Sequence, residues 1–298
     1  MSSLYSNKEN NITKTWLLMV GFLCIIVVVG WFFGQVYGAP EIVYAAVIFS
    51  LVMNIGSYWY SDKLALSLSG ARPAVREEFF DLYTVTENLS ITAGIPMPKI
   101  YVITDDAPNA FATGRNPEHA TIAVTTGLLH MLDRSELEGV IAHELSHIRN
   151  WDILLSTVVV IIVGFLSLLS DFFLRTSRHI RGGDDNRGNA LFVIAGIVLA
   201  ILTPIAGLCI QLAISRKREF LADASGALLT RYPEGLAGAL SKISSYTQPM
   251  KRVHKATAHL FISSPLGGGH EKKIGFWRKL FLTHPPVSER IGALLGKN

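Results

Sequence analysis

Cysteine and charge are both scarce in this chain. The 298 residues include only two cysteines, Cys24 and Cys209, and each lies inside an apolar stretch. This placement argues against a disulfide framework or a cysteine metal site, so both are interpreted as small packing residues. Charged residues make up 17% of the chain, and no stretch interleaves basic with aromatic residues as a nucleic-acid surface does. We therefore expect no nucleic-acid partner.

Long uncharged apolar runs are present instead. Half of the residues are hydrophobic and the mean hydropathy is +0.36, which is too apolar for an ordinary soluble fold. An α-helix needs about 20 apolar residues to cross a bilayer. Segments free of Asp, Glu, Lys and Arg that reach or approach this length are residues 15–40, 42–61, 153–170 and 189–215. We predict a membrane protein in contact with the lipid bilayer.

The apolar runs divide the chain into four parts. In order, these are an N-terminal membrane hairpin, a polar part, a second hydrophobic hairpin and a second polar part: residues 1–61, 62–152, 153–215 and 216–298. Their hydrophobic helices are expected at about residues 15–36, 41–61, 153–174 and 189–214. The second hairpin either spans the bilayer or forms a shallow or protein-buried pair. In both cases the two polar parts face the same compartment.

Basic residues near the ends of the runs orient the chain. With four crossings, one side carries Lys8, Lys14, Lys63, Arg72, Arg76, Arg216, Lys217 and Arg218. Lys and Arg are enriched on the cytoplasmic side of membrane proteins, so both polar parts are predicted to be cytoplasmic. The loop between the third and fourth runs conflicts with this rule, because it carries Arg175, Arg178, Arg181 and Arg187. A second hairpin that does not span would remove the conflict.

Local patterns in the first polar part predict an α+β domain. Apolar residues at helical spacing predict a helix over residues 73–93, which Gly94 ends. Alternating β-branched segments predict strands at residues 99–104 and 120–125. The residues between them, 105–118, contain glycine and prolines typical of a loop.

A capped helix is predicted after the second strand. Ser135 as N-cap, with Glu138 three positions later, forms a capping-box pattern at the start of residues 135–150. Further helices are expected at residues 216–231 and in a short stretch that ends at Leu295.

The capped helix contains His143-Glu144-Leu145-Ser146-His147. Two histidines four residues apart share one face of a helix and can bind one metal ion. Glu144, beside the first histidine, reaches toward a metal-bound water as a general base. The alternative is a chance match, which in such a composition arises in on the order of one chain in a hundred.

A catalytic zinc site needs a third protein ligand and leaves a position open for water. Glu219, in a predicted helix of the second polar part, is the best candidate. Asp223, one turn later, could accept a hydrogen bond from a ligating histidine and fix its tautomer. The alternative is that Glu219 and Asp223 belong to an ordinary solvated helix face.

These motifs, in this order, resemble the M48 membrane metallopeptidases, in particular the bacterial heat-shock proteases of that family. The resemblance covers residues 16–295. Beyond the metal motifs it rests on Pro96-Met97-Pro98, Asn109-Ala110-Phe111-Ala112-Thr113-Gly114, Thr125-Thr126-Gly127-Leu128-Leu129, and His284-Pro285-Pro286 with Arg290. It implies an α-helical membrane protein with an α+β zincin-like (gluzincin) metallopeptidase domain, mostly α with a small β-sheet.

The resemblance also implies roles for individual residues. His143, His147 and Glu219 hold one Zn²⁺ per chain, and Glu144 is the catalytic base. His284 is the expected donor to the oxyanion, although a turn residue before two prolines is the alternative.

Further residues are expected to support or border this site. Asp223 and Asp152 support the ligating histidines, unless Asp152 is a polar stop before the membrane. Asn109, with Gly114, could alternatively be a turn former. By resemblance, the substrate cleft, where an edge strand could pair with a peptide, includes Asn109, Ala110, Phe111 and Arg290.

The expected function is that of a zinc endopeptidase in the bacterial inner membrane, multi-pass, with its active site on the cytoplasmic side. By resemblance its substrates are misfolded or damaged membrane proteins or unfolded polypeptides, in membrane-protein quality control during stress. One alternative is a prenyl-protein-type processing peptidase, although such relatives look longer and carry more spans. Another is a non-catalytic membrane scaffold that binds zinc structurally.

Overall fold

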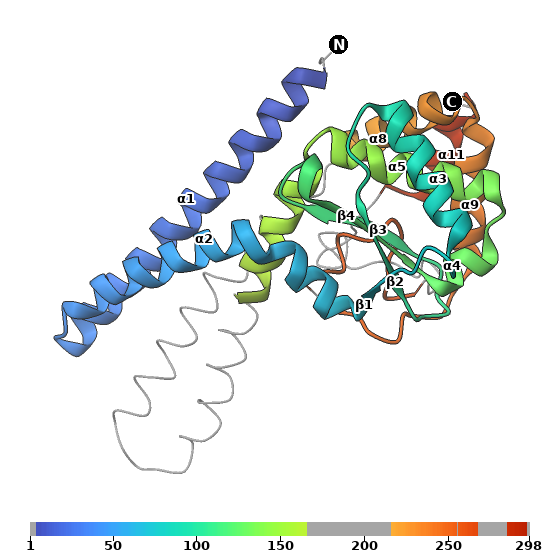
Figure 1. Cartoon of the computed structure of the whole chain (residues 1–298). Coiled ribbons are helices and arrows are strands. Elements are labelled where there is room, and N and C mark those ends of the chain that lie inside the picture. The colour runs from blue at the N-terminus through green and yellow to red at the C-terminus, as the bar shows by residue number, and fades with distance from the viewer. Residues whose placement is uncertain (1–3, 166–215, 255, 268–284, 297–298) are drawn as a thin grey trace.

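The computed structural model describes residues 4–165, 216–254, 256–267 and 285–296. Two long helices extend away from a domain in which helices pack on a small sheet (Figure 1). His284 and the second hydrophobic hairpin beyond residue 165 lie outside the described residues. The chain is mostly helical with a small mixed sheet, as predicted.

The two long helices are α1 (Leu4–Tyr37) and α2 (Glu41–Ser69), which include the helices expected at residues 15–36 and 41–61 and run beyond them. They pack closely where Gly30 faces Ala46, because a Cβ on Gly30 would lie 2.4 Å from the Ala46 Cβ. A larger residue at position 30 would therefore separate the helices.

Each long helix contains a stretch that is long and apolar enough to cross a membrane, Glu9–Gln35 in α1 and Glu41–Tyr60 in α2. Their outward surface is apolar, as contact with lipid requires. Its exposed members include Trp16, Leu17, Val20, Val28, Trp31, Tyr44, Ile48, Val52, Ile55 and Trp59.

The sheet has the strand order β1-β2-β4-β3. The strands are β1 (Ala71–Pro73), β2 (Lys99–Ile103), β3 (Ala110–Gly114) and β4 (Ala120–Thr125). The central pair β2 and β4 is parallel, and both outer strands pair antiparallel to their neighbours. In this described sheet β3 is an outer strand, and it lies beside helix α5 (Arg134–Arg149).

The predicted strands at residues 99–104 and 120–125 are confirmed as β2 and β4. Two other predictions were wrong. Residues 105–118, expected as a loop, contain β3, and the helix expected from residue 73 begins at Phe80 as α3 (Phe80–Ala93). Gly94 ends α3 as predicted, in the left-handed conformation with φ 67°.

Helix α5 is the centre of the domain core. Its residues Val140, Ile141, Leu145 and Ile148 are fully buried. Around it pack α3, α8 (Arg216–Thr230) and α9 (Pro233–Ser245), with α11 (Val287–Leu294) against α8 and α9. The short helix α4 (Thr126–Met131) joins β4 to α5.

The N-terminus of α5 differs from the prediction. Its capping box consists of Asp133 and Glu136, two residues before the predicted Ser135 and Glu138. Asp133 Oδ1 accepts the backbone N–H of Glu136 at 3.0 Å, and Glu136 Oε2 accepts the backbone N–H of Asp133 at 2.9 Å. Two orphan donors are thereby satisfied.

After α5 the chain turns sharply toward the long helices. Trp151 adopts φ 61°, a left-handed conformation that is uncommon for a side-chain-bearing residue. The next helical segment, Asp152–Phe165, is bent by 82° from α5. Its apolar residues form a second buried cluster with Met19, Phe22 and Ile26 of α1. The helix of the histidine motif is thus joined directly to the membrane hairpin.

Candidate metal centre

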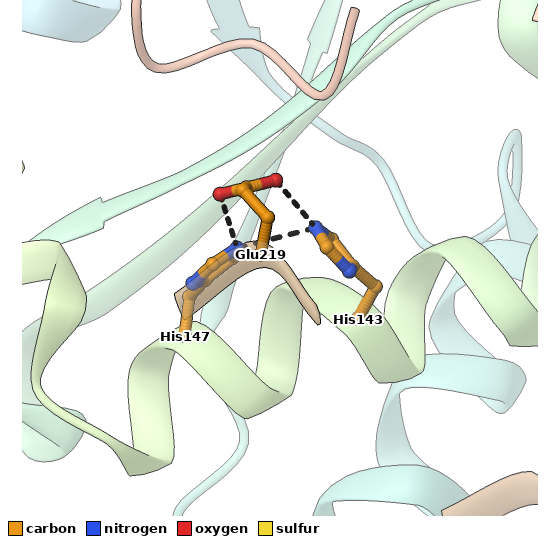
Figure 2. Close-up of side chains that lie close together, drawn as sticks. All are labelled: His143, His147 and Glu219. Carbon is orange, nitrogen blue, oxygen red and sulfur yellow. Dashed lines mark hydrogen bonds and ion pairs between the residues drawn. The ribbon is translucent and has the colours of Figure 1, made fainter. Parts of the chain in front are cut away.

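Three side chains converge from two helices (Figure 2). His143 and His147 lie one turn apart on α5, and Glu219 comes from the first turn of α8. Helix α8 approaches closely because Gly226 has no side chain; a Cβ there would lie 3.0 Å from the backbone nitrogen of His143. One ligand atom of each of the three residues lies within 4.8 Å of the others.

The spacing of these atoms fits a tetrahedral metal ion. Zinc binds histidine nitrogen at about 2.0–2.1 Å, which places neighbouring tetrahedral ligand atoms about 3.3 Å apart. Here His143 Nε2 and His147 Nε2 are 3.1 Å apart. The Glu219 oxygens lie 3.8 Å from His143 Nε2 and 3.6 Å from His147 Nε2. Two imidazoles and one carboxylate are also a ligand set of catalytic zinc sites, so the residues present fit the ion.

Each histidine meets a carboxylate on its other nitrogen. His143 Nδ1 lies 2.9 Å from Asp223 Oδ1. His147 Nδ1 lies 2.9 Å from Asp152 Oδ2, within hydrogen-bonding distance. A proton held on Nδ1 by a carboxylate leaves the Nε2 lone pair free for a metal. Asp223 and Asp152 thus lie beside the Nδ1 atoms of His143 and His147.

Arg290 lies behind Asp223. It is fully buried, and its Nε and Nη2 donate to Asp223 at 2.8 and 2.6 Å. Its Nη1 lies 3.8 Å from Glu219 Oε2. Burial raises the pKa of Asp223, but the hydrogen bonds from Arg290 and His143 outweigh it and lower the pKa. Arg290 thus supports two acidic side chains of the site from a buried position.

Several negatively charged side chains surround His147. Burial by itself lowers the pKa of His147. The hydrogen bond to Asp152 and the negative charges of Glu219, Asp152 and Glu144 have the larger, opposite effect, so the pKa rises to about 9. Glu144 itself is buried, on the same helix. These surroundings favour positive charge at the His147 ring, and a divalent cation supplies such charge.

Three of the residues predicted at the substrate cleft, Asn109, Ala110 and Phe111, lie at the start of β3. The fourth, Arg290, lies instead in α11, where it is fully buried because it donates to Asp223. The Asn109 side chain donates to the Ser263 carbonyl at 3.0 Å and accepts the Ser263 N–H at 3.3 Å. The Ile262 N–H donates to the Ala110 carbonyl at 2.9 Å. Phe111 packs edge-on against Phe261 with 4.9 Å between ring centroids. This end of the outer edge of β3 is therefore paired with the chain's own residues 261–263.

The other end of that edge is also bonded within the chain. The Gly114 N–H lies 3.3 Å from the Thr157 hydroxyl, which also contacts the Gly114 carbonyl at 3.4 Å. Backbone groups of alternate strand residues point to the same edge, so the backbone groups of Ala112 lie at this edge between the two bonded ends. A peptide that paired with β3 would first meet Ala112.

Two residues near the site were not foreseen from the sequence. Asn11 of α1 donates to Asp152, and Arg218 lies 3.7 Å from the same carboxylate. Because Arg218 directly precedes the candidate ligand Glu219, its position near the site could have been predicted from the sequence. Asn11 lies 141 residues from Asp152, and nothing local marks it as different from its polar neighbours.

A helix bearing two histidines and a glutamate, with a carboxylate from a second helix as the third candidate ligand, is typical of metal-dependent peptidases of the gluzincin class. The chain belongs to peptidase family M48, whose model matches residues 77–298. Two long apolar helices accompany this domain. The chain is a membrane metallopeptidase, and the predicted family and enzyme class are confirmed.

Similar proteins match along nearly the whole chain. A Protease HtpX homolog of Caldanaerobacter subterraneus subsp. tengcongensis is 49% identical over 300 residues, covering 98% of this chain and 97% of the relative. One of Thermoanaerobacter pseudethanolicus is 47% identical with the same coverage. One of Tropheryma whipplei is 44% identical over 296 residues, again covering 98% and 97%.

Among solved structures, the crystal structure of S. mikatae Ste24p matches with a TM-score of 0.49 and 18% sequence identity. The match covers 98% of this chain and 66% of that protein, so the chain spans just under two thirds of its length.

Proposed function

We propose that this chain is a zinc-dependent endopeptidase of the bacterial inner membrane. The observation that carries the proposal is the spacing of the three ligand atoms, 3.1 to 3.8 Å, in a set of two imidazoles and one carboxylate. Zinc prefers these donors and this tetrahedral spacing. A bound zinc ion supplies Lewis acidity to peptide hydrolysis.

The chain's own residues carry the proton transfers in the proposed mechanism. Glu144 takes a proton from the attacking water and later delivers it to the leaving amine. Asp152 and Asp223 keep the two ligating rings oriented through their Nδ1 atoms. His284 remains the residue that the family resemblance suggests as donor to the developing oxyanion.

We infer a multi-pass topology with the metal centre on the cytoplasmic side. The distribution of Lys and Arg around the apolar runs supports it. Thiol labelling in intact and permeabilised cells tests it, in a background where Cys24 and Cys209 are replaced by serine. A cysteine at exposed Thr92 should label only after permeabilisation of the inner membrane. Labels at Ser177 and Asn186 report whether the second hairpin crosses.

The proposed substrates are misfolded or damaged membrane proteins and unfolded polypeptides, as part of quality control under stress. The support is positional: the metal-binding helix continues through an 82° bend into residues packed against α1. A substrate segment that emerges from the bilayer would already be near the site, and its local concentration would be high.

The decisive experiment replaces Glu144 by glutamine in the full chain purified in detergent. We expect stoichiometric zinc to remain and cleavage of an unfolded polypeptide to fall by more than about 100-fold, since general base catalysis contributes about 10²–10⁴. Glu138→Gln is the matched control, because it makes the same change on a half-buried residue of α5 whose side chain pairs with Arg134. Full cleavage by Glu144→Gln would refute the mechanism. If the wild-type chain bound zinc but cleaved no polypeptide, the protein would be a zinc-binding scaffold.

A further inference from the structure

Asn11 is a buried polar residue close to the start of an apolar helix. Its side chain is 3% exposed, and it lies in the candidate span Glu9–Gln35 of α1. A polar amide buried in such a helix is costly unless it finds hydrogen-bond partners. The partners of Asn11 lie 139 to 207 residues away, in the domain that holds the metal centre.

Every polar atom of the Asn11 side chain has a partner. The amide nitrogen donates to Asp152 Oδ1 at 2.7 Å and to the Asn150 carbonyl at 3.0 Å. The amide oxygen accepts from Arg218 Nη1 at 3.4 Å. A flipped amide would set its oxygen against a carboxylate and a carbonyl, so these partners define its orientation.

Each of these partners adjoins the metal ligands. Asp152 Oδ2 holds His147 Nδ1 at 2.9 Å, while Asn11 holds the other oxygen of the same carboxylate. Arg218 directly precedes Glu219 in α8. Asn150 caps the C-terminus of α5, the helix of both histidines. Asn11 therefore lies where α1, α5 and α8 meet at the ligand set.

Asp152 Oδ1 accepts its hydrogen bond from the Asn11 amide. Among the described residues, the next partner of its Oδ1 is Arg218 at 3.7 Å, which is too long for a hydrogen bond. Without the Asn11 amide, the carboxylate can turn toward the guanidinium and away from His147. Groups that orient a metal-bound histidine contribute about 10–100-fold to metal affinity.

We propose that Asn11 is a positioning residue of the metal centre, which acts on His147 through Asp152. The inference rests on the proposed function, because it takes His147 as a zinc ligand. The first membrane helix is then a structural part of the metal site as well as an anchor.

A purely structural role for Asn11 would be to fasten α1 to its neighbours. Asn54 offers a matched control for that role. Its amide donates to the Met19 carbonyl at 3.2 Å, so it ties α2 to α1 through a buried amide that does not contact the ligand set. Asn54→Ala should loosen the hairpin without removing a partner of Asp152.

The test uses the full chain in detergent, stripped of metal, with the variants Asn11→Ala, Asn11→Asp and Asn54→Ala. Zinc affinity is measured by competition with a chromophoric chelator, and ligand geometry by the absorption bands of bound Co²⁺. Asn11→Asp keeps the size of the side chain but loses both N–H donors. We expect both Asn11 variants to bind zinc about 10–100-fold more weakly with altered Co²⁺ bands, and Asn54→Ala to stay within about twofold.

Wild-type affinity and Co²⁺ bands in both Asn11 variants would overturn the proposal. Wild-type zinc affinity and Co²⁺ bands in Asn11→Asp alone would also overturn it, because the volume of the side chain and not its N–H groups would then matter. An equal loss of zinc affinity in Asn54→Ala would overturn it as well. If Asn11→Ala fails to fold, Asn11→Asp decides. A wild-type chain that takes up no zinc would refute the proposed function and this inference together.

Discussion

Replacing Arg290 by methionine should destabilise the protein while leaving every metal ligand in place. Arg290 is fully buried and donates twice to Asp223, at 2.6 and 2.8 Å. Removal of one partner of a buried ion pair costs about 3–5 kcal/mol, because the other charge is left buried. His143 still contacts Asp223 at 2.9 Å. We therefore place the loss at the lower end, about 3 kcal/mol.

Thermal unfolding of the detergent-solubilised chain, followed by tryptophan fluorescence, measures this loss. For domains of about 150–250 residues each kcal/mol shifts Tm by about 2–4 °C, so a fall of about 6–12 °C is expected. Arg76→Met is the control, because the Arg76 pair with Glu87 is exposed on both sides. Exposed pairs contribute about 0–1 kcal/mol, which corresponds to less than about 4 °C.

A double replacement, Arg290→Met with Asp223→Leu, separates stability from metal binding. Replacing both partners by apolar residues removes the lone buried charge, so most of the lost stability should return. Zinc affinity of the double variant should be lower than that of the wild type, because His143 has lost the carboxylate at its Nδ1. A Tm of Arg290→Met within about 2 °C of wild type would refute the reasoning, as would a double variant no more stable than the single one.

Other expectations follow from the same geometry. Chelation should abolish cleavage and lower Tm, and added Zn²⁺ should restore both, because a ligand that binds only the folded state stabilises it. Asp152→Ala should weaken zinc binding about 10–100-fold in the competition assay, because His147 loses its partner. Gly226→Ala should weaken zinc binding, because the added Cβ would push α8 away from His143. Gly164→Ala is the control and should not weaken it, because a Cβ there would lie at an ordinary contact distance from its neighbour. Equal zinc affinities in the two variants would contradict this.

The candidate ligands could be named from the sequence. The spacing of His143 and His147 follows from helical periodicity, and Glu219 and Asp223 repeat that spacing on a second helix. Only the family resemblance favoured Glu219 as a ligand over a residue of an ordinary solvated helix face. The capping box was misplaced because Asp133 and Ser135 each precede a glutamate by three residues. The structure uses the first pair, in which buried Glu136 also accepts from Lys242 at 2.6 Å. That contact spans 106 residues, and no local pattern reports it.

Strand β3 was missed for a related reason. Its sequence Ala-Phe-Ala-Thr-Gly is buried at every position, so it lacks the alternation of apolar and polar residues by which a half-exposed strand is recognised. Its burial comes from α5 on one face and from residues 261–263 and Thr157 at its edge. Contacts of this kind depend on the tertiary fold, and so does the link between Asn11 and Asp152.

The short path from His147 to the membrane hairpin has a mechanical consequence. Four residues after His147, Trp151 turns the chain, and the segment Asp152–Phe165 packs directly against α1. Asp152 contacts His147 with one oxygen and Asn11 of α1 with the other. A shift of the hairpin against α5 would therefore break the hydrogen bond from Asn11 to Asp152, the carboxylate that also contacts His147. The same contacts tie the candidate metal centre to the two helices that are long and apolar enough to cross a membrane.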